Sequence, residues 1–288
     1  MTTYRSDRMF AWINNAFIIF ISLTMISPLI HIAAISFSSP YYANANLVVF
    51  WPRGFNTEVY HVIFGMKSMW RSMAVTIYIT VLGTFIALFF TATMAYALSR
   101  PRMPARKFIL QATIVSFIFS IPLIPGYLVV RSVGLENTLW ALIIPGALGT
   151  FNILIMRAFF KGISAELFDA AQIDGCNELG IFARMAIPLS MPVVATIALF
   201  HAVSQWNSYF SAIIYIRSRE LYPLQVLLRS LVVDIDGSGT RSLGVSTVTT
   251  AETMKAGIII FATVPILIVY PFLQKYFVKG AMLGSLKE

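Results

Sequence analysis

The feature that most constrains this chain is a series of long apolar segments, the first of which runs from Ala11 to Phe37 without one Asp, Glu, Lys or Arg. A transmembrane helix needs about 20 consecutive apolar residues to cross the hydrocarbon core of a bilayer. With 58% hydrophobic and only 11% charged residues, the composition excludes an ordinary soluble domain. The sequence therefore predicts an all-α integral membrane protein in which residues 1–288 form a single transmembrane domain. The six spans are expected at residues 11–37, 74–98, 108–130, 139–160, 191–216 and 256–278.

Positive charge in one short turn sets the expected orientation of these spans. Arg100, Arg102, Arg106 and Lys107 lie between the second and third apolar segments. Short loops rich in Lys and Arg remain on the cytoplasmic side of a membrane. We therefore expect a multi-pass protein with both termini in the cytoplasm. The net charge of +9 is spread over loops and forms no basic stripe, so nucleic acid is not an expected partner.

The second span carries small residues along one helical face. Such residues let a neighbouring transmembrane helix approach closely, so we expect this face to be packed inside the bundle. The small residues are Thr76, Thr80, Thr84, Ala87, Thr91 and Ala95.

The polar stretch from Ser164 to Pro192 interrupts the apolar pattern between the fourth and fifth spans. It holds four of the twelve carboxylates of the chain. An ionised side chain at the centre of a bilayer costs roughly 2.5–3.5 kcal/mol even on a lenient insertion scale. The stretch is therefore expected to be a structured loop on the cytoplasmic surface of the membrane.

Local sequence signals predict a helix, a tight turn and a second helix in this stretch. Ser164 is a good N-cap, and Gly175 supplies the left-handed conformation that ends a helix. Asn177 is expected to cap a second helix that ends before Pro188. One face of the first helix is expected to consist of small and apolar residues, namely Ile163, Leu167, Ala170 and Ala171.

The same stretch resembles the cytoplasmic coupling motif of bacterial ABC importer permeases, which reads Glu-Ala-Ala, three residues, Gly, nine residues, Ile-x-Leu-Pro. Here the motif begins at Asp169, continues through Gly175 and ends at Pro188, with Asp for Glu, Met185 for Ile and Ile187 for Leu. These replacements keep charge or apolar character. The segment 134–177 further resembles carbohydrate-importer permeases of the maltose type, most closely the branch for complex and acidic oligosaccharides such as alginate or pectin fragments.

This resemblance implies a type I ABC importer permease of the bacterial inner membrane, with six transmembrane helices and a cytoplasmic coupling loop at residues 163–190. The implied partners are a second homologous permease subunit, two ATP-binding subunits that hold ATP and Mg, and an extracytoplasmic solute-binding protein that delivers an oligosaccharide. The residues implied to couple to the ATPase are Glu166, Asp169, Ala170, Ala171, Asp174, Gly175 and Pro188.

A polar and aromatic cluster in the fifth span supplies the candidates for the substrate path. Gln205, Trp206, Asn207 and Tyr209 stand in an otherwise apolar segment, and lipid offers no hydrogen-bond partners to such groups. Aromatic rings and amides together suit the faces and hydroxyls of a sugar. Helix packing and interface anchoring are the alternative role of these residues.

The third span contains Pro122, Pro125 and Gly126. These residues leave two interpretations open, a kink in the helix or a break that lines a transport path.

Chemistry absent from the sequence narrows the function further. There is no G-x-x-x-x-G-K-[ST] phosphate loop, no H-E-x-x-H and no G-x-S-x-G, so we expect no catalytic residue, metal or cofactor in this chain. The predicted spans hold no ionisable pair of the kind that ion-driven carriers place at the midplane. ATP hydrolysis by partner subunits is therefore the expected source of energy. The alternatives are an ABC permease for a non-sugar solute and a stand-alone membrane carrier or enzyme.

Overall fold

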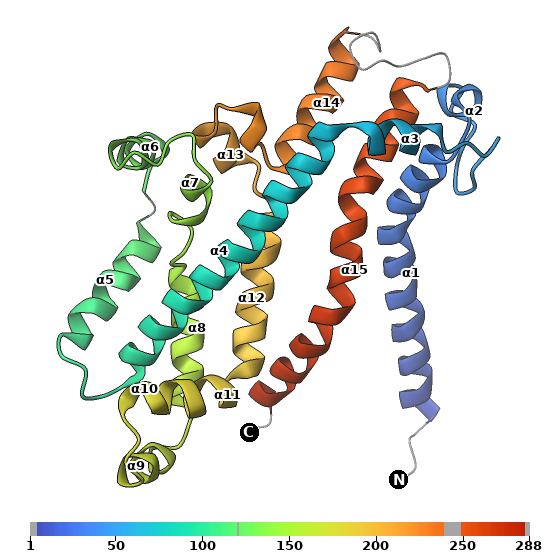
Figure 1. The fold of residues 1–288 in the computed structure, drawn as a ribbon. Helices are drawn as coiled ribbons and strands as arrows, with labels where there is room; N and C mark the ends of the chain where they lie inside the picture. Colours follow the sequence, from blue (N-terminus) through green and yellow to red (C-terminus); the bar gives the residue numbers. More distant parts are fainter. Residues whose placement is uncertain (1–4, 120, 239–248, 286–288) are drawn as a thin grey trace. The chain divides into compact units, whose positions relative to one another are not determined.

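The computed structural model describes residues 5–119, 121–238 and 249–285, and every regular element in these ranges is helical (Figure 1). The chain divides into two compact units, which are described here separately. Unit 1 comprises Met1–Met69 and Leu228–Pro265, and unit 2 comprises Trp70–Leu227 and Ile266–Glu288.

Unit 1 contains α1 (Arg5–Ser36), α2 (Pro40–Asn44), α3 (Glu58–Gly65), most of α14 (Leu224–Ser238) and the first half of α15 (Ala251–Ser285). A close helix contact joins α3 to α15. A Cβ atom added to Gly257 would lie 2.3 Å from Cγ1 of Val59 and 2.9 Å from Cδ1 of Ile63. Only glycine therefore permits α15 to lie this near to α3.

Unit 2 begins with α4 (Lys67–Ser99), a long helix without an internal proline. The buried side of α4 confirms the predicted small-residue face, since Thr76, Ala87, Thr91 and Ala95 are all at most 3% exposed. Within the unit, α8 packs against α5 and α12, and α7 packs against α13. These helices are α5 (Arg106–Ile118), α6 (Leu123–Ser132), α7 (Trp140–Ile143), α8 (Thr150–Lys161), α12 (Met191–Trp206) and α13 (Phe210–Tyr215).

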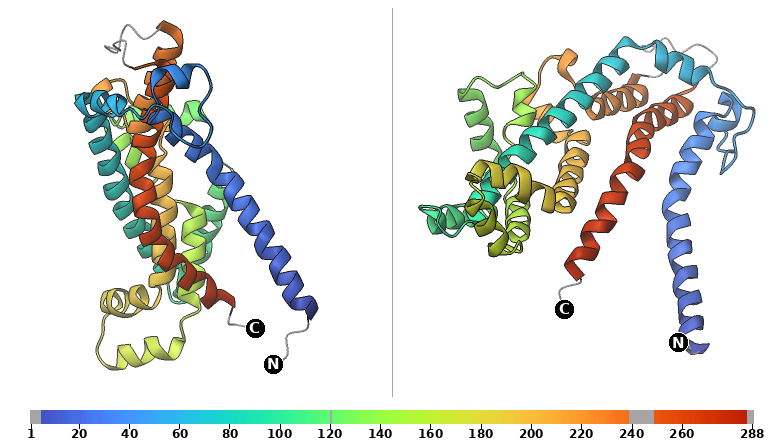
Figure 2. Two further views of the ribbon diagram at one scale, coloured as in Figure 1. Left: turned by 90° about the vertical axis from the view of Figure 1, so that its right-hand side faces the viewer. Right: turned by 60° about the horizontal axis from the view of Figure 1, so that its bottom comes forward.

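The predicted coupling loop, residues 163–190, forms a separate layer at one end of unit 2, and we call it the coupling segment. It lies beyond the ends of α8 and α12, whereas α6, α7 and α13 lie at the opposite end of the unit (Figures 1 and 2). Its elements are α9 (Ala165–Ile173), α10 (Glu178–Ile181), a π-helical turn (Phe182–Ala186) and α11 (Ile187–Leu189).

The expectation that the second helix of the coupling segment ends before Pro188 is wrong. Helical backbone continues from α10 through the π-helical turn into α11 and ends at Leu189. A proline normally clashes with the carbonyl one helical turn before it. Here Pro188 stands in the first turn of α11, where its missing N–H group is least costly.

Among the described residues, three helices are long and apolar enough to cross a membrane, namely Arg8–Ser36, Lys67–Ser99 and Ala251–Val269, and the bent pair Glu178–Leu189 and Met191–Trp206 would be a fourth if it crosses as one span. The three helices coincide with the first, second and sixth predicted spans. The third, fourth and fifth predicted spans are each divided into two helices, α5 and α6, α7 and α8, and α12 and α13. Six spans therefore remain a prediction, which requires each of these pairs to cross as one interrupted span.

The interruptions have local causes. Pro145 and Gly146 separate α7 from α8, because proline lacks a backbone donor and glycine favours flexible backbone. Asn207 ends α12, and its side-chain Nδ2 donates to the carbonyl of Val203 at 2.8 Å. Pro122 precedes α6 and forms its N-cap. The third span thus contains a break rather than a simple kink.

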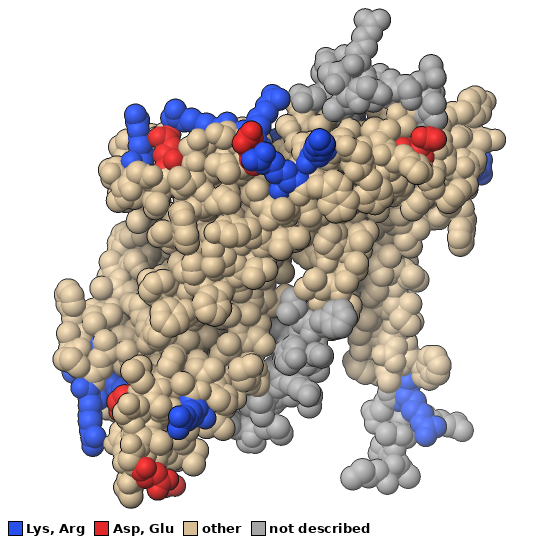
Figure 3. All heavy atoms as spheres, viewed as in Figure 1, with Lys and Arg blue, Asp and Glu red and all other residues tan. Residues whose placement is uncertain are grey.

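Charged side chains gather at the two ends of unit 2 and leave an uncharged band between them (Figure 3). One end holds the four cations of the turn between α4 and α5 and the four carboxylates of the coupling segment. At the other end lie ion pairs between Arg71 and Glu220 and between Arg217 and Glu136. This is the distribution that a membrane-spanning bundle requires.

Candidate functional site

The turn of the coupling segment is built as the sequence predicted. Oγ of Ser164 accepts a hydrogen bond from the amide of Glu166 at 3.3 Å, and so caps α9. Gly175 has a φ of +81°, in the left-handed region, and the following amide of Cys176 donates to the carbonyl of Ala171 at 2.9 Å. Oδ1 of Asn177 accepts from the amide of Gly180 at 2.7 Å, which caps α10.

The residues predicted to share one face of α9 differ in their exposure. Ala171 is buried and Ile163 packs at the edge of the core, but Ala170 is exposed and Leu167 is 46% exposed. The side chain that anchors the helix is Phe168, which is 5% exposed.

Most residues implied to couple to the ATPase are therefore on the surface. Glu166, Asp169, Ala170, Asp174, Gly175 and Pro188 are exposed, whereas Ala171 is buried. Beside them, Ile173 is 86% exposed and Leu179 is 76% exposed. Exposed apolar side chains on a segment this polar are typical of a protein interaction surface.

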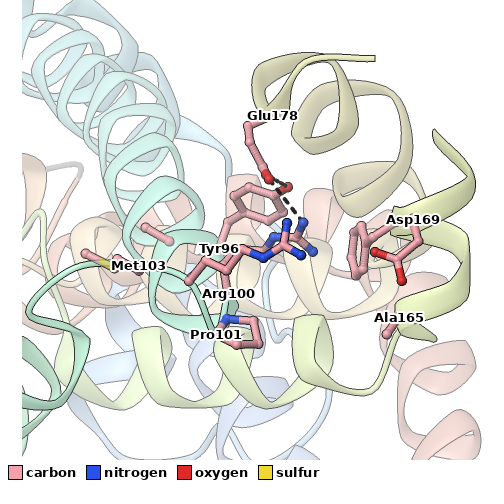
Figure 4. Close-up of a pocket in the computed structure, with 10 residues that line it drawn as sticks. Tyr96, Arg100, Pro101, Met103, Ala165, Asp169 and Glu178 are labelled. Atoms are coloured by element: carbon pink, nitrogen blue, oxygen red, sulfur yellow. Dashed lines mark hydrogen bonds and ion pairs between the residues drawn. The ribbon is translucent and has the colours of Figure 1, made fainter. Parts of the chain in front are cut away.

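A carboxylate joins the coupling segment to α4 (Figure 4). Oε2 of Glu178 accepts from the hydroxyl of Tyr96 at 2.7 Å, and Oε1 accepts from Nη2 of Arg100 and from Nε2 of Gln172, both at 3.1 Å. The guanidinium of Arg100 also lies 4.5 Å from the ring centroid of Phe168. We call Glu178, Tyr96 and Arg100 the Glu178 joint.

The sequence analysis did not predict this joint. Glu178 was recognised only as one carboxylate of the polar stretch, and Tyr96 and Arg100 stand about 80 residues earlier in the chain. No local signal connects residues that meet only in the folded bundle. A pocket of about 650 Å³ opens beside the joint, with Met103, Ala165 and Asp169 among its lining residues (Figure 4).

A polar cavity of about 570 Å³ lies in unit 2 where two of the helices are interrupted. Pro145 and Gly146 line it from the break between α7 and α8, and Asn207, Ser208 and Tyr209 line it from the break between α12 and α13. Irregular backbone at membrane depth is tolerated where it faces protein or lines a water-filled cavity. The volume falls within the usual range for small-molecule sites.

Three of the four predicted path residues, Gln205, Asn207 and Tyr209, line this polar cavity, but Trp206 does not. Gln205 is buried, and its Nε2 donates to the carbonyl of Leu142 on α7 at 3.0 Å. A Cβ atom at Gly83 on α4 would lie 2.8 Å from this nitrogen. Gln205 thus fixes three helices around the cavity as well as lining it.

Other lining residues extend the polar character of the cavity. Nδ1 of His201 lies 3.3 Å from Oγ1 of Thr84, which places a second side-chain contact between α12 and α4. Within the part of the chain that the structure describes, the cavity is lined by hydroxyl, amide and aromatic groups but by no carboxylate and no Lys or Arg. The further polar residues are Asn152, Ser204, Ser211 and Tyr215. Asn152 comes from α8, in the predicted fourth span, which the sequence analysis did not connect with the fifth-span cluster, and Tyr215 lies in the predicted fifth span but was not named as a candidate.

Tyr215 connects the polar cavity to a charged cluster at the end of the unit. Its ring stacks on that of Tyr127, with the centroids 6.3 Å apart and the planes 7° from parallel. The hydroxyl of Tyr127 donates to Glu136 at 2.5 Å, and Nη2 of Arg217 donates to Glu136 at 2.6 Å. Arg131 also pairs with Glu136, with 3.7 Å between Nε and Oε2. We call Arg131, Glu136 and Arg217 the Arg217 cluster.

The electrostatics of the Arg217 cluster favour the ionised forms of Glu136 and Arg217. The hydrogen bond from Tyr127 is the main cause that lowers the pKa of Glu136 below its ordinary value, and the neighbouring arginines add to it. The hydrogen bond with Tyr127 and the charge of Glu136 raise the pKa of Arg217. Two cations share one carboxylate, so the cluster carries a net positive charge.

The chain is similar to a known protein family and to two known proteins over most of its length. Residues 105–282 match a family described as binding-protein-dependent transport system inner membrane component. The chain is 39% identical over 283 residues to the polygalacturonan/rhamnogalacturonan transport system permease protein YtcP of Bacillus subtilis (strain 168), covering 98% of this chain and 99% of that protein. It is 41% identical over 288 residues to protein LplC of the same organism, covering 100% of this chain and 98% of that protein.

A solved structure is also similar over nearly the whole chain. It belongs to a bacterial ABC transporter involved in the import of the acidic polysaccharide alginate, with a TM-score of 0.89, 35% sequence identity and coverage of 96% of this chain and 99% of that one. The similarity extends beyond the coupling segment to the interrupted helices of unit 2 and to the long helices of unit 1.

Proposed function

The chain belongs to the family of binding-protein-dependent transport system inner membrane components, and we propose that it is one of two permease subunits of an ATP-driven importer of acidic oligosaccharides. Members of this family are parts of transporters rather than catalytic enzymes. The observation that carries the proposal is the arrangement of unit 2, in which the exposed coupling turn and the polar cavity are joined by shared helices.

In the proposed topology, six spans cross the inner membrane and both termini are cytoplasmic. The spans are α1, α4, the pairs α5 with α6, α7 with α8 and α12 with α13, and α15. Two features support this topology. The cation-rich turn between α4 and α5 lies at the same end of unit 2 as the coupling segment, as expected for the cytoplasmic side. The uncharged band lies between the two charged ends (Figure 3).

At the cytoplasmic end, the proposed partners are two ATP-binding subunits, which bind ATP and Mg. A cleft in one of them would receive α9 and the turn at Gly175. The exposed apolar side chains of Leu167, Ile173 and Leu179 suit such a contact, and the carboxylates of Glu166 and Asp169 surround them with polar groups. A second homologous permease completes the membrane domain, and an extracytoplasmic binding protein delivers the substrate at the opposite end.

The chemistry of the cavity supports a sugar as the cargo. Its amides and hydroxyls can hydrogen-bond to sugar hydroxyl groups, and Phe210 and Tyr215 offer aromatic faces. The similar proteins are named for polygalacturonan and rhamnogalacturonan transport and for import of the acidic polysaccharide alginate. In this chain, the net positive Arg217 cluster adjoins the cavity through Tyr127 and Tyr215, and it would favour sugars that carry carboxylates.

The proposal is tested by purifying the tagged chain from its native membrane in mild detergent, identifying the co-purified subunits, and measuring ATP-dependent uptake after reconstitution. We expect an ATPase and a second six-span protein, and uptake of oligogalacturonate or oligoalginate when the binding protein is present. Asp169→Lys should abolish uptake and binding-protein-stimulated hydrolysis. Uptake of a non-sugar solute would replace the proposed cargo, and transport by the lone chain would overturn the proposal.

A further inference from the structure

We infer that the Glu178 joint transmits movement of the coupling segment to α4, and through α4 to the polar cavity. The inference rests on the proposed role of the coupling segment in docking an ATPase. It identifies Glu178, Tyr96 and Arg100 as positioning residues, which act on the cavity through α4, the helix that carries Tyr96 and ends directly before Arg100.

The connectivity of unit 2 leaves a role for such a joint. The coupling segment follows α8 directly in the chain and leads directly into α12, so movement of the segment pulls on both helices through covalent bonds. Helix α4 has no such link, because it leaves unit 2 at one end and enters the turn before α5 at the other. It can follow the segment only through side-chain contacts.

The joint supplies directional contacts to a single carboxylate. Tyr96 and Arg100 reach Glu178 from the end of α4, and Gln172 reaches it from α9. One side chain on α10 therefore ties together three elements (Figure 4). The surrounding core adds apolar contacts between Tyr96 and Phe168, whose ring centroids are 6.5 Å apart. Apolar contacts tolerate sliding, whereas hydrogen bonds fix both distance and direction.

The middle of helix α4 also contacts two residues that line the polar cavity. Thr84 contacts His201, and Gly83 lies against Gln205. Twelve residues separate Thr84 from Tyr96, which corresponds to about 18 Å at 1.5 Å per helical residue. Because α4 is continuous over this distance, it can transmit a displacement at the joint to the residues that line the cavity.

The test uses the complete transporter, with both permeases, the ATPase subunits and the binding protein, reconstituted in liposomes. Uptake of labelled oligogalacturonate and ATP hydrolysis are measured together, and the readout is molecules imported per ATP. We expect Glu178→Ala to lower this ratio at least fivefold while hydrolysis continues, and Tyr96→Phe to lower it less. The exchange of Glu178→Arg with Arg100→Glu should restore at least half of the ratio.

The matched control is Arg102→Gln, since Arg102 is an exposed cation of the same turn with no ion pair among the described residues. Its ratio should equal that of the wild type. A joint that only stabilises the fold would lower the amount of assembled complex in Glu178→Ala and Tyr96→Phe without changing the ratio. An unchanged ratio in both variants would overturn the inference, whereas a wild-type complex that imports no oligosaccharide would instead overturn the proposed function.

Discussion

Replacing Gly175 by alanine should loosen the coupling turn without any steric clash. Gly175 has a φ of +81°, and a Cβ atom added to it would meet no atom within 4 Å. The whole effect of the substitution must therefore come from the left-handed backbone, which costs roughly 1–2 kcal/mol for a residue with a Cβ atom. That free energy corresponds to an increase of about 5–30-fold in the population of the opened turn.

The opened turn can be measured by hydrogen exchange of the peptide that covers residues 165–181. The relevant amides belong to Asp174, Gly175 and Cys176, which donate to the carbonyls at the end of α9. In Gly175→Ala these amides should exchange about 5–30-fold faster under conditions where exchange reports the opening equilibrium. Gly175→Asn should be affected less, because asparagine tolerates the left-handed conformation.

The control for this experiment is Gly65→Ala. Gly65 also has no atom within 4 Å of an added Cβ, but its φ is not positive, so exchange should be unchanged. Two outcomes would contradict the reasoning: amide exchange in Gly175→Ala at the wild-type rate, or exchange in Gly175→Asn as fast as in Gly175→Ala. Either would show that the left-handed backbone conformation is not the reason for glycine at this position.

Three further predictions concern other parts of the chain. Gly83→Ala should displace the side-chain amide of Gln205 and lower uptake into liposomes, while the yield of assembled complex stays unchanged. Uptake at the wild-type rate would show that Gln205 does not hold the helices around the cavity. Gly257→Ala should destabilise unit 1 by about 1–3 kcal/mol, because the added Cβ atom overpacks the contact with α3, and the thermal unfolding temperature should fall. Gly65→Ala is the control, and equal stability of the two variants would contradict the prediction. The pKa of Glu136 is lower in the folded protein than its ordinary value of 4.5, so its ionised form stabilises the fold above that pH, and this stabilisation is lost as the pH falls through the folded-state pKa. The difference in unfolding temperature between the wild type and Glu136→Gln should therefore shrink on acidification. A difference that stays constant would show that the ionisation of Glu136 does not contribute to stability.

The long spans and the coupling turn were predictable because each depends on local sequence. Uncharged length defines α1, α4 and α15, while Ser164, Gly175 and Asn177 mark the helix ends through their own hydrogen bonds or backbone angle. The small-residue face of α4 followed from helical spacing alone, and the structure confirms that it is packed.

The interruptions of the helices and the Glu178 joint were harder to predict. Prolines in the third predicted span left both a kink and a break open. The breaks near Gly146 and Asn207 were missed because the flanking residues are apolar enough to be predicted as one helix. The joint depends on the meeting of Tyr96 with Glu178 across 82 positions of sequence, which no periodicity records. The burial of Phe168 was equally hard to predict, since its ring packs against Tyr96 and Arg100, which are distant in the sequence.

The central claim, that the coupling segment docks an ATPase, is tested most directly by a photo-crosslinking amino acid at Ile173, which is 86% exposed. In the membrane-embedded transporter, irradiation should link this position to an ATP-binding subunit, and the yield should change when ATP is trapped in the complex. The same probe at Val133, which is 62% exposed at the opposite end of unit 2, should not react with that subunit. Crosslinks from Ile173 to lipid or to the extracytoplasmic binding protein, with none to the ATPase, would contradict the account.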